Sequence, residues 1–97
     1  MPTFVTLVNW TDQGVKAYKD SVERADAFMG LVDKSGGKVV GNYWTLGAYD
    51  LVVITEAPDA ETATAVLLQV GALGNVRTKT MQAFDRAAFQ EILAKTS

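Results

Sequence analysis

The sequence places a phenol next to a carboxylate in a short polar segment, Gly47-Ala48-Tyr49-Asp50, between two apolar runs. These two groups could form an acid–base pair, in which Asp50 orients or removes a proton and Tyr49 donates a hydrogen bond to an oxyanion. A structural role is the favoured alternative, because Asp often accepts hydrogen bonds from backbone amides in turns and Gly47 can supply a positive φ angle. The catalytic candidates are therefore Tyr49 and Asp50, together with Arg77.

A second set of polar and aromatic residues stands at the ends of three predicted strands. Asn9 and Trp10 close the first strand, Glu56 closes the third, and Asn75 to Arg77 open the fourth. We expect the first and third strands to be parallel, which would gather these residues at one end of the sheet, opposite the hairpin tip. Arg77 could then bind a carboxylate or enolate, and Trp10 could stack on a ring. A purely structural Arg77–Glu56 ion pair is the favoured alternative.

Two adjacent aromatic residues, Tyr43 and Trp44, fall on the second predicted strand. Neighbouring side chains on a strand point to opposite faces, so one ring faces the helices and the other faces away from them. Packing is the favoured role for both rings, and the wall of a ligand cavity is the alternative. The residues predicted to bind a ligand are thus Asn9, Trp10, Tyr43, Trp44, Glu56, Asn75 and Arg77.

Two residue types are absent from the 97-residue chain, which contains no cysteine and no histidine. Their absence excludes disulfides, thiol nucleophiles, zinc–thiolate sites, Ser-His-Asp catalysis and histidine-ligated haem. No acidic cluster has the spacing of a metal site, so we predict neither a metal nor a cofactor. Nine basic residues against eleven acidic ones, without a basic stripe, argue against nucleic acid as a partner.

The chain shows no basic leader and no apolar run long enough to cross a bilayer, which predicts a cytoplasmic protein without membrane contact. Its length predicts a single domain over residues 1–97. A core of this size is modest, and burial against a partner subunit would add to its stability.

Hydrophobic periodicity predicts the secondary structure. Strands are expected over residues 4–10, 38–46, 50–56 and 75–84. One helix is expected to begin near residue 20 and end at the glycines 36 and 37, a second to run from residue 58 to residue 73, and a short third helix to follow Asp85. The first helix should bury Val22, Ala25, Met29 and Val32, with Phe28 widening the stripe.

This order predicts a ferredoxin-like α+β sandwich, a β-α-β-β-α-β antiparallel sheet with both long helices on one face. Right-handed crossovers give the spatial strand order fourth, first, third, second. Residues 39–40 and 51–54 are apolar at consecutive positions, which indicates that both faces of these strands are covered. Because two helices cover only one face, we expect the other to meet an identical sheet in a homodimer.

Four short motifs occur in order between these elements. They are residues 11–15, Thr-Asp-Gln-Gly-Val; residues 47–50, Gly-Ala-Tyr-Asp; residues 56–59, Glu-Ala-Pro-Asp; and residues 74–78, Gly-Asn-Val-Arg-Thr. Together they resemble the GYD-domain family, named for Gly-x-Tyr-Asp. The resemblance implies a dimeric α/β barrel in which two four-stranded sheets face each other. It implies no activity, because the family's role is unassigned and its wider structural relatives include cofactor-free monooxygenases, isomerases, haem enzymes and small-molecule-binding modules.

Three functions stay open. The first is a homodimer whose barrel or helix–sheet crevice binds a small apolar or aromatic molecule. The second is a cofactor-independent enzyme, monooxygenase- or isomerase-like, that uses Asp50, Tyr49 or Arg77 on an activated carbonyl or phenolic substrate. The third is a structural or assembly subunit. A packed crevice would favour assembly, an apolar cavity with few polar groups would favour binding, and a cavity into which a carboxylate points would favour catalysis.

Overall fold

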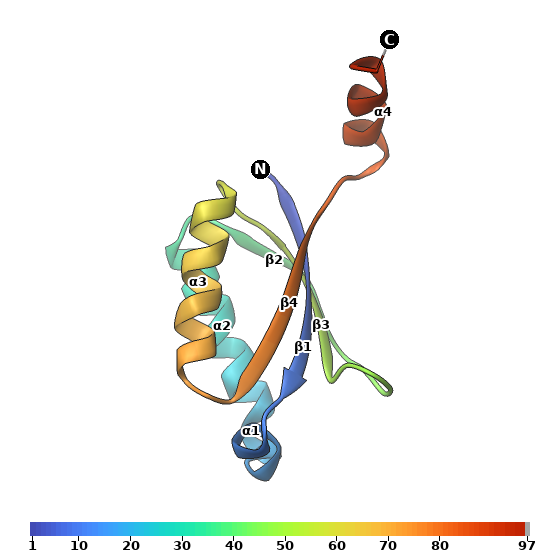
Figure 1. Cartoon of the computed structure of the whole chain (residues 1–97). Coiled ribbons are helices and arrows are strands. Elements are labelled where there is room, and N and C mark those ends of the chain that lie inside the picture. Colours follow the sequence, from blue (N-terminus) through green and yellow to red (C-terminus); the bar gives the residue numbers. More distant parts are fainter. Residues whose placement is uncertain (97) are drawn as a thin grey trace.

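The computed structural model describes residues 1–96 and contains a four-stranded antiparallel sheet with two long helices on one face (Figure 1). The strand order, β2-β3-β1-β4, is the predicted one, and the ferredoxin-like α+β fold is confirmed. The elements are β1 (Thr3–Trp10), α1 (Asp12–Lys16), a 3₁₀ turn (Tyr18–Asp20), α2 (Ser21–Lys34), β2 (Lys38–Trp44), β3 (Leu51–Glu56), α3 (Ala60–Ala72), β4 (Val76–Ala83) and α4 (Arg86–Ala94).

Side chains and glycines fix the helix ends. Thr11, Asp59 and Asp85 each accept a hydrogen bond from a backbone amide in the first turn of α1, α3 and α4, respectively. Gly36 and Gly74 follow α2 and α3 with φ angles of 86° and 83°, a conformation that glycine adopts without a steric penalty. The boundaries of the elements around the sheet are therefore set locally by the sequence.

The relative direction of the first and third strands differs from the prediction. β1 and β3 are antiparallel, with Thr3 opposite Glu56 and Val8 opposite Leu51. Helix α2 returns the chain so that β2 runs parallel to β1, and the hairpin then reverses it, so β3 must oppose β1. Trp10 consequently lies at the same end of the sheet as the hairpin tip, and Glu56 lies at the other end.

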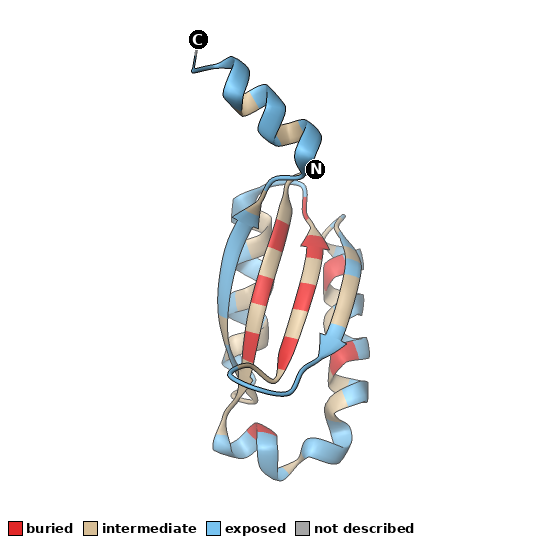
Figure 2. Ribbon diagram, turned by 90° about the vertical axis from the view of Figure 1, so that its right-hand side faces the viewer, coloured by how far each residue is buried: buried red, intermediate tan, exposed pale blue. Residues whose placement is uncertain are grey.

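The two faces of the sheet are unlike each other. Along β1 and β3, buried residues alternate with half-buried ones (Figure 2). The buried set, which includes Phe4, Val8 and Val53, lies beneath the helices. We call the opposite side the open face, because no described helix packs on it (Figure 1). Its apolar residues are Val5, Leu7, Tyr43, Val52, Ile54 and Met81.

The inward face of α2 is rotated relative to the predicted stripe. Ala25 and Val32 are buried and Phe28 packs on the core, but Val22 and Met29 are 58% and 38% exposed. Both stripes have helical spacing, so periodicity could not choose between them. The phase that buries the aromatic ring of Phe28 removes more apolar surface from water.

Helix α4 stands clear of the rest of the molecule (Figure 1). None of its described residues is buried, and Phe89 and Leu93 are half exposed. The radius of gyration of 14.5 Å reflects this projection, since a compact chain of this length would have about 12.5 Å. The chain thus leaves two apolar surfaces uncovered, the open face and α4.

Candidate functional site

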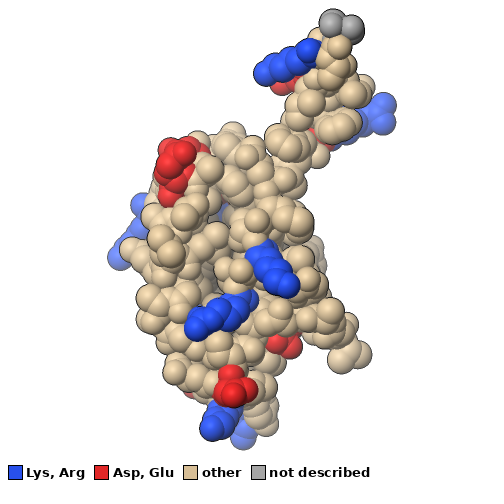
Figure 3. Space-filling view, viewed as in Figure 1, with Lys and Arg blue, Asp and Glu red and all other residues tan. Residues whose placement is uncertain are grey.

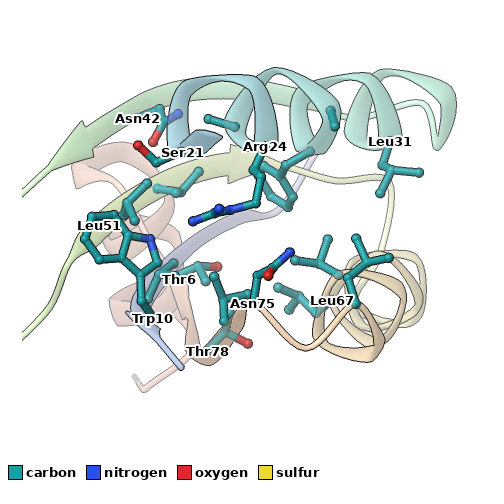
Figure 4. Close-up of a pocket in the computed structure, with 18 residues that line it drawn as sticks. Thr6, Trp10, Ser21, Arg24, Leu31, Asn42, Leu51, Leu67, Asn75 and Thr78 are labelled. Carbon is teal, nitrogen blue, oxygen red and sulfur yellow. The ribbon is translucent and has the colours of Figure 1, made fainter. Parts of the chain in front are cut away.

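A cavity of about 140 Å³ lies between the sheet and helices α2 and α3 (Figure 4). Its walls are mainly apolar, and they include Val8, Phe28, Leu31, Leu51, Leu67 and Val70. A hydrocarbon-lined cavity of about 150 Å³ accommodates benzene in an engineered protein. The crevice is therefore large enough for one six-membered ring.

The charged group of the cavity lies toward one end, and the smaller polar residues Thr6, Asn75 and Thr78 also line the cavity. Figure 4 shows the guanidinium of Arg24 extending into the space, with Ser21 and Asn42 beside it, and Leu31 and Leu67 at the opposite end. Arg24 is the only ionisable residue in the lining, which contains no aspartate or glutamate. The cavity thus has a cationic end at Arg24, and leucine side chains form the wall of the opposite end.

Two backbone carbonyls hold Arg24 in place. Its Nη1 donates to the carbonyl oxygen of Ala17 at 2.8 Å, and its Nη2 donates to that of Gly14 at 3.2 Å. Gly14 lies within α1, and Ala17 follows the helix directly. A guanidinium has five N–H donors, so these two bonds orient the group without using up its donors.

Asn42 brings an unsatisfied acceptor to the same region. Its Oδ1 is buried and has no hydrogen-bond partner among the described residues. The residue lies opposite Val53, after an irregularity in β2 between Val39 and Gly41 that turns its side chain toward the helices. A buried acceptor without a donor costs about 1–3 kcal/mol.

The hairpin tip is tied to the end of β1 beside the cavity. The carboxylate of Asp50 accepts a hydrogen bond from the amide of Trp10 at 2.8 Å, and the amide of Asp50 donates to the carbonyl of Val8 at 2.8 Å. The Nδ2 of Asn9 donates to the carbonyl of Ala48 at 2.9 Å. The hydrogen-bond partner of the Asp50 carboxylate is thus a backbone amide, as the structural alternative expects, but this amide is in β1 and not within the turn.

The loop after α3 meets the same end of β1. The amide of Thr11 donates to the carbonyl of Asn75 at 3.0 Å, and its hydroxyl donates to that of Gly74. Gln13 donates to the side-chain oxygen of Asn75 at 3.0 Å, and Gly14 packs directly on the Asn75 carbonyl. Residues 9–14, 47–50 and 73–75 thus form one connected region, which we call the motif junction.

The structure separates the residues predicted to bind a ligand. Trp10 and Asn75 line the cavity, and Asn9 belongs to the motif junction. Glu56 lies at the far end of the sheet, so it is not grouped with the other predicted residues and cannot form the predicted ion pair with Arg77. That part of the prediction was wrong because it assumed parallel strands.

The remaining candidates also lie outside the cavity lining. Tyr43 and Arg77 are exposed on the open face, opposite Val52 and Asn9. Trp44 is on the helix side of β2 and is 44% exposed. The ring of Tyr49 lies 5.8 Å from the Lys79 ammonium, a contact typical of a cation–π pair.

The sequence-based prediction missed Arg24 and Asn42. Arg24 stands four residues before Phe28, which is a spacing that places both side chains on one helical face. A helical phase in which Phe28 faces the core also turns Arg24 toward the core. Asn42 gave no comparable signal, because its orientation depends on the irregularity in β2.

The described residues show no metal site and no membrane-spanning helix, and the face seen in Figure 3 shows no basic stripe. Within residues 1–96, no group of three or more acidic side chains is arranged to hold a metal ion. None of the helices in this range combines the length and apolarity needed to span a membrane. The face seen in Figure 3 carries scattered charges of both signs and no continuous basic stripe.

The protein is thus a ferredoxin-like α+β domain, and the cavity between its helices and its sheet is large enough for one six-membered ring. The model of the GYD domain matches residues 4–93, and the chain belongs to this family. The family resemblance predicted from the four motifs is confirmed. The chain is also similar to the glutamine synthetase and cystathionine beta-lyase binding protein of Thermus thermophilus, with 36% identity over 84 residues, 86% of this chain and 88% of the relative.

Solved structures support the same fold. The crystal structure of TTHA0845 from Thermus thermophilus is 26% identical, with a TM-score of 0.57, and the match covers 88% of this chain and 95% of that protein. The feast or famine regulatory protein of M. tuberculosis, solved with L-methionine, is 15% identical with a TM-score of 0.65. That match covers 88% of this chain and 51% of the regulator, and it shows the fold alone.

Proposed function

We propose that this protein is a single-domain, cytoplasmic, homodimeric binding protein for a small apolar or aromatic molecule. The observation that carries the ligand-binding role is the ring-sized cavity with apolar walls and few polar groups. Ligand sites typically combine such walls with a small number of polar groups that fix orientation. The lining residues leave a cavity between the sheet and the helices. A purely structural subunit would be expected to have this space fully packed.

The geometry favours binding over catalysis. The carboxylate of Asp50 is engaged by the amide of Trp10, and neither Tyr49 nor Arg77 lines the cavity. The lining also contains no carboxylate that could act as a general base. The alternative of a cofactor-independent enzyme therefore has no support from the placement of its three candidate residues.

Filling the cavity tests the ligand-binding role. We expect the protein to bind a single-ring compound from the set benzyl alcohol, benzamide and benzoate, with chemical-shift changes concentrated on cavity residues in amide NMR spectra. Val70→Phe should abolish this binding because the larger ring occupies the cavity. Leu68→Phe is the matched control, since Leu68 is on the same helix and 70% exposed. Absence of saturable binding by all three compounds, or undiminished binding by Val70→Phe, would contradict the proposal.

The open face supports the homodimer. Val52 and Ile54 lie there beside Val5 and Leu7, without cover from the described chain. A second copy of the same sheet would remove this apolar surface from water. We expect Val52→Lys to convert a dimer into a folded monomer in sedimentation velocity, with circular dichroism preserved.

The choice of residue matters for this test. Val53 is buried beneath the helices, so Val53→Lys would disrupt the core instead of the interface. Val22→Lys is the matched control, because Val22 is exposed on the outer side of α2. A wild-type protein that sediments as a monomer would remove the homodimer from the proposal.

A second candidate function is the binding of other proteins. It is favoured by the similarity to the Thermus relative, which is named as a binding protein for glutamine synthetase and cystathionine beta-lyase. Helix α4 offers a projecting apolar surface that includes Phe89 and Leu93. Surface plasmon resonance with each purified enzyme tests this role. Leu93→Asp should weaken such binding, whereas loss of the exposed Leu68 side chain on α3 should not.

A further inference from the structure

We infer that the ligand of the helix–sheet cavity is a small organic monocarboxylate with one apolar ring or branched aliphatic group, bound through its carboxylate to Arg24. This inference rests on the proposed ligand-binding function and adds the charge and the orientation of the ligand. Its basis is the polarity of the cavity, in which a single cation faces an otherwise neutral lining.

The charge of the site is positive although the chain as a whole is not. The protein has a formal net charge of −2, yet Arg24 is the only charged side chain that lines the cavity. The two hydrogen bonds that its guanidinium makes to residues 14 and 17 go to neutral backbone carbonyls and not to carboxylates. Arginine stays charged in proteins, so the site presents a permanent cation that lacks an anion.

The geometry of Arg24 suits a carboxylate. The bonds to Gly14 and Ala17 take two of its five N–H donors and leave others for a planar anion, which guanidinium groups often bind through two parallel hydrogen bonds. Gly14 is itself fixed by its contact with Asn75 in the motif junction. The cation is therefore positioned before the ligand arrives, which lowers the entropic cost of binding.

The neighbouring acceptor adds a second element of recognition. The buried Oδ1 of Asn42 has no donor within the described chain, and Figure 4 places it on the same side of the cavity as Arg24. A hydroxyl group next to the carboxylate of the ligand would supply that donor. Among monocarboxylates, a hydroxy acid should therefore bind more tightly than the acid without the hydroxyl group.

The remaining volume sets the size of the apolar part. Beyond Arg24 the cavity continues between Phe28, Leu31, Leu67 and Val70, which offer no hydrogen-bonding side-chain groups. With a cavity volume of about 140 Å³, there is room for one ring or a branched aliphatic chain. A doubly charged metabolite would place its second charge among these hydrocarbon side chains, away from the one cation of the lining.

The test compares benzoate with benzamide, which have nearly the same shape and differ in charge. Isothermal titration calorimetry on the unmodified protein should give a dissociation constant at least tenfold lower for benzoate. In Arg24→Gln this preference should disappear, chiefly through a loss of affinity for benzoate. Arg77→Gln removes an arginine outside the cavity and should keep the preference. Mandelate, whose hydroxyl group is not held in a planar ring by its own carboxylate, should bind more tightly than phenylacetate.

The outcomes separate this inference from the proposed function. Equal or tighter binding of benzamide would overturn the anionic ligand while leaving a small-molecule-binding role intact. A tenfold preference that persists in Arg24→Gln would overturn the role assigned to Arg24. If neither compound binds and no other ring compound of the NMR set binds, the proposed function itself fails. The comparison on the unmodified protein decides the question of charge even if Arg24→Gln does not fold.

Discussion

The motif junction and the cavity lie side by side and share Trp10, Leu73 and Asn75, but the polar groups of the two regions differ in how they are hydrogen-bonded. In the junction, side chains bond mostly to backbone groups, and Gly14 allows two segments of backbone to touch. In the cavity, the guanidinium of Arg24 keeps donors beyond its two backbone hydrogen bonds, and the Oδ1 of Asn42 has no partner among the described residues. The hydrogen-bonding groups of the motif junction are thus largely paired within the chain, whereas those of the cavity are not fully paired.

This difference separates what marks the family from what can bind a ligand. Three of the four motifs that identify the chain as a GYD-domain protein meet in the junction, where they join the end of β1 to the hairpin and to the loop after α3. The groups suited to a ligand come from α2 and β2, outside those motifs. We therefore expect changes in the junction to act on stability and changes in the cavity lining to act on ligand affinity.

The largest effect should follow from a change at the closest backbone contact of the junction. In Gly14→Ala the new methyl group would collide with the Asn75 carbonyl, and backbone on both sides resists movement. We expect a loss of about 3 kcal/mol or more in the free energy of unfolding, measured by urea denaturation. Gly30→Ala is the control, because a methyl group there meets nothing and alanine favours helix by about 1 kcal/mol. Equal stabilities of the two variants would show that the junction is not tightly packed.

A smaller effect is expected from the carboxylate of the Gly-x-Tyr-Asp motif. Asp50→Ala leaves the amide of Trp10 without its acceptor, which should cost about 1–3 kcal/mol. In a domain of this size each kcal/mol lowers the melting temperature by about 4–8 °C. Asp26→Ala, which removes an exposed carboxylate from α2, should change the melting temperature little. An Asp50→Ala protein of unchanged stability that no longer binds a ligand would instead assign Asp50 to the site.

The same contrast explains how much could be predicted from the sequence. Element order and handedness were enough for the strand order, and the start of the last helix after Asp85 was recognisable because a cap acts within a few residues. The direction of β3 against β1 also follows from topology, and its misassignment moved Glu56 to the wrong end.

The cavity was less accessible to prediction, because its polar residues depend on phase. Trp10 and Asn75 were predicted to bind a ligand from their positions at strand ends, and both line the cavity. Arg24 turns inward only in the helical phase that buries Phe28, and Asn42 does so only after the irregularity in β2. Small shifts of this kind are set by tertiary packing, to which a local pattern of apolar residues does not respond.

The smallest predicted effect comes from a residue outside both regions, the N-cap of α3. Asp59 accepts a hydrogen bond from the amide of Thr62 at 2.7 Å, and hydrogen bonding by Thr62 lowers the pKa of this carboxyl below its ordinary value. A group whose pKa is lower in the folded state contributes stability above its ordinary pKa and loses it as the pH falls through the lowered value. Between neutral pH and about pH 3, Asp59→Asn should therefore show a shallower loss of stability than the wild type, when thermal unfolding is followed at each pH.

Benzoate affinity at neutral pH should be unchanged in this variant, because Asp59 belongs neither to the junction nor to the cavity lining. A change in that affinity would mean that the position of α3 couples its N-terminus to the cavity, and the separation between stability and binding would then not extend to this helix.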